Sequence, residues 1–281
     1  MLDIDKFLAA SVKDLEGISW YEIVSKLGLL SFNAQGNKPM ELISTIAHIT
    51  EKSTVLVVGC GAGGTTMHLA EVTGAEVHGI DISPESIAIA KELGSKSSAR
   101  DKLHFQIGDA RDLSFPPNTF DAVVTEYMAF FLQPDTFCNF LLALKPGGSI
   151  AMAELMKDPN VDAKANARIL ATEETYSELL GYKFHIPLSS EYVDWLTRAG
   201  FKQVNIETKI SPPSFRERLD SVGGWKNLFK IIKVTLKLMR ASKDLRKKFM
   251  QMGRVKRVIS QQRSTAKYIF QAILVGQRPL S

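Results

Sequence analysis

The sequence lacks the features that mark disulfide-rich, secreted or membrane-spanning proteins. Its 281 residues include two cysteines, Cys60 and Cys138, too few for a disulfide framework or a four-cysteine zinc site. Scarce cysteine fits a reducing compartment, and the acidic first residues lack the basic-then-apolar order of a signal peptide. No apolar stretch approaches the ~20 residues of a membrane span. We therefore expect a soluble, cytoplasmic protein.

The chain is also without tandem repeats or low-complexity tracts. Its residues are 45% hydrophobic and 23% charged, so the chain can bury a sizeable core and is not expected to be disordered. A length of 281 residues suits one large domain or two small ones.

Positive charge is concentrated in one segment. The formal net charge of the chain is +5, but residues 212–265 contain 15 lysines and arginines and only three acids. This segment therefore carries +12, and the remaining residues together carry −7. The charge pattern indicates an acidic body that bears a strongly basic insertion.

Short apolar segments alternate with helical segments along the body of the chain. The expected strands are residues 55–58, 76–80, 103–107, 122–124, 149–153, 201–208 and 268–275. The expected helices are residues 65–72, a segment that opens at Ser83-Pro84, and residues 136–144, 162–180 and 189–200. This alternation predicts an α/β fold with a mainly parallel, doubly wound sheet covered on both faces. The basic segment then lies between the last two strands.

The first 50 residues are expected to be helical. Apolar residues recur at helical spacing in Tyr21, Ile23, Val24 and Leu27. A break that is rich in glycine, asparagine and proline, residues 33–39, separates this helix from the next one.

A glycine-rich loop, residues 59–64, stands where the first strand meets the first helix of the body. Glycines allow a sharp turn and a close approach of the backbone to a ligand, and a helix N-terminus presents unpaired N–H groups to it. Gly59, Gly61 and Gly64 also match the dinucleotide fingerprint G-x-G-x-x-G. Asp81 follows the second strand, where a carboxylate suits ribose hydroxyls in either type of cofactor.

Residues further along distinguish the two cofactor types. Asp109 follows the third strand, where a carboxylate can accept a hydrogen bond from an adenine amine. A Pro-Gly-Gly turn, residues 146–148, precedes the fifth strand. With these motifs the chain resembles the class I S-adenosylmethionine-dependent methyltransferases, in particular the type 11 group of ubiquinone and menaquinone methyltransferases. The resemblance covers about residues 33–210 and the last strand.

The resemblance implies a seven-stranded sheet in the order 3-2-1-4-5-7-6, with the last strand antiparallel. It implies a methyltransferase core at residues 51–210 and 266–281, an N-terminal helical cap segment at residues 1–50, and a basic helical lid at residues 211–265. The implied cofactor is S-adenosyl-L-methionine, which leaves as S-adenosyl-L-homocysteine.

The same resemblance assigns residues to the cofactor. It implies contacts with the methionine part, the ribose, the adenine and the sulfonium end of the cofactor from Gly36, Gly59, Gly61, Gly63, Asp81, Ile82, Asp109, Ala110 and Glu126. One departure concerns Val57, since many members of the family carry an acid there that orders the glycine loop. A cofactor-binding regulatory protein without turnover is therefore an alternative.

Methyl transfer needs alignment more than acid–base groups. The sulfonium is already an activated leaving group, so the protein has to hold acceptor and methyl about 3 Å apart and exclude water. A base is needed only for an acceptor that arrives protonated. Open α/β sheets bind ligands at the carboxyl ends of their strands, so we expect the acceptor near Tyr127, Glu154 and His185. No residue is assigned to a metal.

The basic insertion contains an amphipathic pattern at residues 225–248. Trp225 and Phe229 belong to an apolar stripe, and Lys226, Lys230 and Lys233 belong to a basic one. Such a helix can cover an anionic or amphipathic small acceptor, lie on a membrane surface or contact nucleic acid. We expect a methyltransferase acting on a small or lipid-like acceptor under a helical lid. Peripheral membrane contact and RNA methylation are alternatives.

Overall fold

The computed structural model describes residues 10–18, 20, 23, 36–211, 214–221 and 224–280. The chain divides into two compact units. We call residues 35–156, 187–211 and 271–281 the sheet unit, and residues 1–34, 157–186 and 212–270 the helical unit. Tyr21, Val24 and Leu27, on which the first predicted helix rests, lie outside the described residues.

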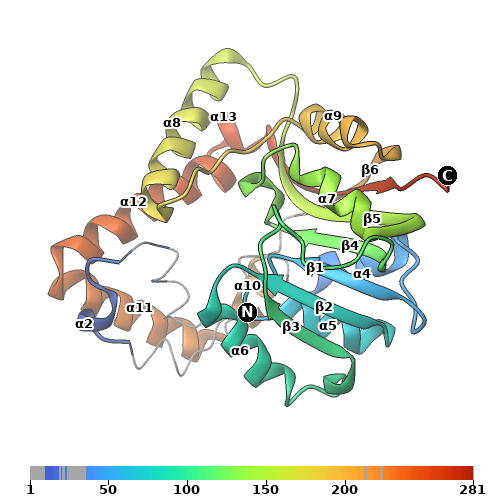
Figure 1. Cartoon of the computed structure of the whole chain (residues 1–281). Helices are drawn as coiled ribbons and strands as arrows, with labels where there is room; N and C mark the ends of the chain where they lie inside the picture. Colours follow the sequence, from blue (N-terminus) through green and yellow to red (C-terminus); the bar gives the residue numbers. More distant parts are fainter. Residues whose placement is uncertain are drawn as a thin grey trace. The chain divides into compact units, whose positions relative to one another are not determined.

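The sheet unit is built on seven strands in the order β3-β2-β1-β4-β5-β7-β6, as predicted (Figure 1). The strands are β1 (Thr54–Val58), β2 (Glu76–Asp81), β3 (Leu103–Ile107), β4 (Phe120–Glu126), β5 (Leu144–Lys157), β6 (Lys202–Ile210) and β7 (Ile269–Gln277). Strands β1 to β5 pair in parallel, and β7 is antiparallel to β6, which confirms the expected orientation of the last strand.

Burial explains why β1 has no alternation of polar and apolar residues. Val55, Leu56, Val57 and Val58 are all at most 2% exposed, because helices cover both faces of a parallel sheet. Two strands flank β1, with Val57 opposite Gly79 of β2 and Val124 of β4.

Two groups of helices accompany the sheet (Figure 1). They are α4 (Lys38–Ile46), α5 (Gly64–Thr73) and α6 (Pro84–Gly94) in one group, and α7 (Thr136–Ala143) and α9 (Ser189–Ala199) in the other. Helix α5 contacts α4 and β2, whereas α9 contacts α7 and β6. The start of α6 follows the predicted signal, since Ser83 Oγ accepts from the Ser86 N–H at 3.1 Å and Pro84 is the first helical residue.

Some predicted boundaries were wrong. Strand β5 begins at Leu144 rather than Ser149, and its register with β4 shifts between Phe120 and Ala122. The Pro-Gly-Gly turn is therefore an irregularity inside the strand, where Gly147 adopts φ +80°. Helix α4 begins at Lys38, so the end of the predicted break is helical.

The helical unit contains all the described helices of the basic segment. Its helices are α2 (Val12–Leu15), α8 (Ala163–Leu180), α10 (Phe215–Ser221), α11 (Gly224–Ala241), α12 (Lys243–Ser260) and α13 (Arg263–Ala266). Helix α12 packs along α8 and also contacts α11 and α13 (Figure 1). This unit thus takes in residues 157–186, which the sequence analysis placed in the core. Among the described residues, no helix combines the length and hydropathy needed to cross a membrane.

Candidate functional site

Asp81 holds the glycine loop from the end of β2. Its Oδ2 accepts a hydrogen bond from the Gly61 N–H at 2.9 Å, and its Oδ1 accepts one from the Ser83 N–H at 2.9 Å. The residue is 9% exposed, and burial raises the pKa of its carboxyl above the ordinary value. Each carboxylate oxygen keeps a further lone pair, so Asp81 can also accept hydrogen bonds from two ribose hydroxyls.

The three predicted loop glycines differ in what surrounds them. Gly59, Gly61 and Gly63 all have a positive φ angle, which residues other than glycine rarely adopt. A Cβ atom on Gly63 would lie 2.9 Å from the ring of Phe105, so this glycine serves packing. A Cβ atom on Gly61 would meet nothing within 4 Å. The loop therefore borders open space at Gly61, where a ligand can approach the backbone.

Val57 is the departure from the family pattern, and the structure places it 2% exposed within β1. In this chain the Gly61 N–H is already bound by Asp81. The glycine loop is thus tied to β2 by a carboxylate even though Val57 provides none.

Ile82, Asp109 and Ala110 follow the ends of β2 and β3, at the same edge of the sheet as the glycine loop. The Ile82 side chain is 53% exposed and offers an apolar surface, whereas Ala110 is 4% exposed. Both carboxylate oxygens of Asp109 accept from Arg111 Nε at 3.0 Å, and this hydrogen bonding lowers the Asp109 pKa. Asp109 is therefore ionised at neutral pH, and an adenine amine would share it with Arg111.

Gly36 is the most N-terminal of the predicted cofactor residues. It has φ +62° and precedes α4. The next residue, Asn37, lies against α5 through a 3.0 Å hydrogen bond between its Nδ2 and His68 Nδ1. Since α5 follows the glycine loop directly, this bond fixes the Gly36 segment near the loop.

Glu154 organises the segment that follows β4. It is fully buried, and its Oε1 accepts from the Thr125 hydroxyl at 2.7 Å and the Ala129 N–H at 3.1 Å, while its Oε2 accepts from the Met128 N–H at 3.1 Å. Tyr127 lies within this segment and adopts φ +50°. Through these hydrogen bonds Glu154 holds in place the loop that carries Tyr127.

Burial dominates the electrostatics of this loop. It raises the pKa of the Glu154 carboxyl to about 7, although three hydrogen bonds oppose the shift. Burial and the carboxyls of Glu126 and Glu154 raise the pKa of the Tyr127 phenol as well. Tyr127 therefore stays protonated and can donate a hydrogen bond, but it is a poor base. Glu126, the last residue of β4, is partly exposed.

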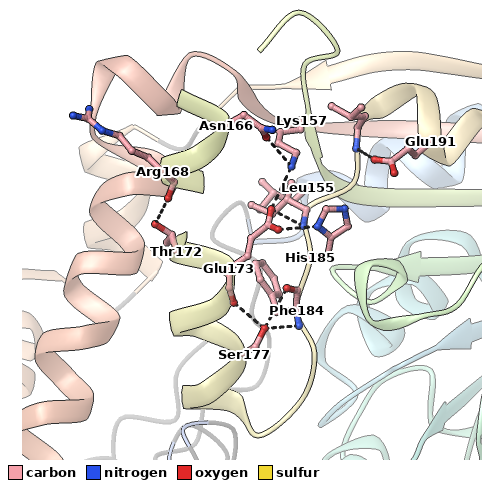
Figure 2. Close-up of polar contacts among 12 residues, drawn as sticks. Leu155, Lys157, Asn166, Arg168, Thr172, Glu173, Ser177, Phe184, His185 and Glu191 are labelled. Carbon is pink, nitrogen blue, oxygen red and sulfur yellow. Dashed lines mark hydrogen bonds and ion pairs between the residues drawn. The ribbon is translucent and has the colours of Figure 1, made fainter. Parts of the chain in front are cut away.

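The third predicted acceptor-side residue, His185, belongs to the helical unit together with Glu173 of α8. Its Nδ1 lies 2.7 Å from Glu173 Oε2, and Glu173 Oε1 accepts from the Ile186 N–H at 3.1 Å (Figure 2). Lys157, the last residue of β5, has its Nζ 3.6 Å from Glu173 Oε1. Both Lys157 and Glu173 are buried, whereas the His185 side chain is 36% exposed.

The tautomer of His185 follows from this pairing. A carboxylate oxygen accepts hydrogen bonds, so this pairing favours the tautomer in which Nδ1 of His185 is the donor to Glu173 Oε2. The loop that leads to His185 is fixed as well, because Ser177 Oγ accepts from the Phe184 N–H at 2.9 Å (Figure 2). Geometrically, Glu173 and His185 form an oriented acid–base pair.

The chain is similar in sequence and in fold to known methyltransferases. Residues 55–148 match the family model described as "Methyltransferase domain". This match identifies a methyltransferase domain at residues 55–148, and the strand order β3-β2-β1-β4-β5-β7-β6 is the order that the resemblance to class I S-adenosylmethionine-dependent methyltransferases implies. The glycine loop thus implies S-adenosyl-L-methionine rather than a dinucleotide, and the open backbone at Gly61 and the lone pairs of Asp81 fit that cofactor.

Individual relatives share only part of their length with the chain. A phosphoethanolamine N-methyltransferase of Triticum aestivum is 28% identical over 211 residues, which are 74% of this chain and 39% of the relative. O-methyltransferase cnsE of Penicillium expansum is 32% identical over 157 residues, 54% of this chain and 53% of the relative. The chain therefore spans about half or less of these curated relatives.

A solved structure shares the fold more completely. The crystal structure of the [4+2]-cyclase SpnF superimposes with a TM-score of 0.63 at 20% identity, covering 87% of this chain and 81% of that one. Since that protein is called a cyclase, the fold alone does not determine the reaction.

Several residues of the site have no signal in the sequence. They are Glu173 as the partner of His185, Thr125 as a donor to Glu154, and Asn37 and His68 as the link between α4 and α5. None of these pairs has a short, fixed spacing in the sequence, so no local motif signals them.

Proposed function

We propose that the chain transfers the methyl group of S-adenosyl-L-methionine to a small-molecule acceptor. The observation that carries this proposal is the carboxylate of Asp81, which binds the glycine loop and keeps lone pairs for ribose hydroxyls. The cofactor supplies an activated sulfonium methyl group. Asp81, the open backbone at Gly61 and the exposed Ile82 side chain then bind and orient it.

The acceptor, in this proposal, carries an anionic group such as a phosphate or carboxylate. The basic segment supports this assignment, because residues 212–265 carry a net charge of +12. Lys226, Lys230 and Lys233 of α11 are exposed, and so are the apolar residues Trp225 and Phe229. An amphipathic basic helix suits an acceptor with an apolar body and an anionic end. One relative is named for phosphoethanolamine, a phosphomonoester. The helices α10 to α13 would act as a lid over such an acceptor.

We further assign a base to the reaction. A hydroxyl or ammonium acceptor has to lose a proton before or during methyl transfer. His185 is the base in this proposal, because its Nδ1 lies 2.7 Å from the buried carboxyl group of Glu173, which orients the imidazole ring. Glu173 is then a positioning residue that stabilises the imidazolium after the proton has been taken. Glu154 positions the loop after β4, which carries Tyr127.

Cofactor binding and acceptor choice are tested separately. Calorimetry should detect binding of S-adenosylhomocysteine and no binding of NAD; the opposite result would reject the cofactor. Transfer of a labelled methyl group is then measured on phosphorylated amines, on their unphosphorylated counterparts and on RNA. Activity on phosphorylated acceptors supports the proposal, and activity on RNA alone contradicts it.

The role of the basic helix is tested by reversing charge. Lys230→Glu together with Lys233→Glu should raise the KM for an anionic acceptor at least roughly tenfold and leave S-adenosylhomocysteine binding unchanged. Lys52→Glu, at an exposed lysine of the sheet unit, is the matched control. Equal KM values for the helix variant and the control would remove α11 from acceptor recognition.

His185 is tested through the pH profile. His185→Asn should lower kcat by roughly 10²- to 10⁴-fold for an acceptor that must lose a proton. Glu173→Gln keeps the size of the side chain and should lower kcat less, with a shifted pH optimum and little change in KM. A kcat for His185→Asn within a few-fold of the wild type, with an unchanged pH profile, would show that the pair is structural.

A further inference from the structure

A cluster of metal-ligating side chains lies on β2 and β3, away from the residues assigned to methyl transfer. Glu76 and His78 are two residues apart on β2, so their side chains lie on the same face of the sheet. His104 of β3 is the register partner of His78 in the parallel pair. One potential ligand atom from each of the three residues lies within 4.8 Å of the others.

The distances in this cluster fit a tetrahedral metal ion. Glu76 Oε1 lies 3.4 Å from His78 Nε2 and 3.2 Å from His104 Nε2. Bonds of 2.0 to 2.1 Å in tetrahedral geometry place neighbouring ligand atoms about 3.3 Å apart. The two imidazole rings stack with centroids 4.6 Å apart and planes at 24°, and the Nε2 atoms of both rings lie near the same Glu76 oxygen.

Neighbouring aromatic rings keep His78 in place. The edges of Phe115 and Phe120 pack against the His78 ring and restrict its rotation. His104 and Glu76 are 48% and 45% exposed, so an ion can reach them from solvent.

We propose that Glu76, His78 and His104 form a binding site for a divalent transition-metal ion, most readily Zn²⁺, with water as the fourth ligand. Two imidazoles and one carboxylate are a ligand set that zinc uses. The site is at the amino ends of β2 and β3, whereas Asp81 is the last residue of β2 and Asp109 follows the carboxyl end of β3. Strand rise separates Glu76 from Asp81 by about 17 Å. The bound ion would link the amino ends of β2 and β3 and would not take part in methyl transfer.

The proposal is tested by titrating the purified chain with zinc chloride after treatment with a chelator. We expect one zinc ion per chain and a higher Tm with zinc than without it. His104→Ala and Glu76→Gln should each weaken zinc binding at least roughly tenfold. Both side chains are nearly half exposed, so these variants are expected to fold, which the Tm without zinc verifies.

A matched control keeps the test specific. His48→Asn removes another exposed imidazole of the sheet unit, at a position with φ +52° that asparagine tolerates. This variant should bind zinc like the wild type. No zinc binding by the wild type, or equal binding by the wild type and His104→Ala, would overturn the proposal. Neither result depends on the methyl acceptor or on the cofactor.

Discussion

Glu154→Gln should change how the stability of the protein depends on pH. Glu154 is fully buried, and its carboxyl has a pKa of about 7 in the folded chain against 4.5 as the ordinary value. A raised pKa favours the protonated form in the folded state, so the stability linked to this group is complete below pH 4.5 and is lost as pH rises through 7. The full loss is about 3 kcal/mol, and most of it falls between pH 5 and pH 8.

The glutamine variant removes this titration and keeps most of the contacts. Its amide oxygen can still accept from the Thr125 hydroxyl and the Ala129 N–H, whereas its amide nitrogen faces the Met128 N–H that Oε2 accepts from in the wild type. The variant is therefore expected to be less stable at pH 5. Between pH 5 and pH 8 the free energy of unfolding of the variant should fall less than that of the wild type, by about 2 to 3 kcal/mol.

Urea denaturation at several pH values measures this difference, with circular dichroism as the signal. Glu207→Gln, which removes an exposed carboxyl of β6 in the same unit, is the control. The carboxyl carbon of Glu154 can be followed directly by NMR in protein with ¹³C-labelled glutamate. Stability profiles that run parallel for the wild type and Glu154→Gln would refute the argument, and so would a Glu154 carboxyl that titrates near pH 4.5.

Two further predictions concern the cofactor loop and the thiols. Asp81→Asn should weaken binding of S-adenosylhomocysteine at least roughly tenfold, since an ionised acceptor of the ribose hydroxyls and of the Gly61 N–H is lost; calorimetry that finds equal affinity would reject this role. An aromatic disulfide reagent should react with one thiol of the native chain, because Cys138 is exposed whereas Cys60 is buried and burial raises the pKa of its thiol. Both thiols should react in urea, and two reactive thiols in the native chain would contradict the burial of Cys60.

The fold followed from the sequence where local signals and the family resemblance agreed. The apolar run of β1, the Ser83-Pro84 start of α6 and the glycine stop after α9 were all visible in the sequence. The strand order came from the resemblance, since alternation alone predicts a parallel sheet without its order. The start of β5 was missed because Gly147 at φ +80° is typical of a turn, and the sequence does not show that the pairing with β4 resumes beyond it.

The sequence predicted which residues form the candidate site, but it did not predict the hydrogen-bond partners of these residues. The glycine loop, Asp81 and Asp109 stand at strand ends that the alternation marks, and their contacts with the cofactor stay predictions. The hydrogen bonds of Arg111 with both oxygens of Asp109 could not be predicted. The geometry of an exposed side chain leaves no pattern in the sequence. The pairing of His185 with Glu173 depends on how the loop after α8 folds back on that helix, which twelve residues of separation do not reveal.

The division of the chain into two units has a consequence for how the protein is made. The chain leaves the sheet unit after residue 156, returns at residue 187, leaves again after residue 211 and returns at residue 271. Strand β7 lies between β5 and β6 in the sheet, yet it is the last strand to emerge from the ribosome. The sheet therefore stays open at that position until residues 269–277 have been synthesised. Among the described strands β6 pairs with β7 alone, so β5 and β6 each keep an exposed edge until β7 is in place. Exposed strand edges can pair with other chains, so the interval before β7 is made is when the sheet unit is most open to aggregation.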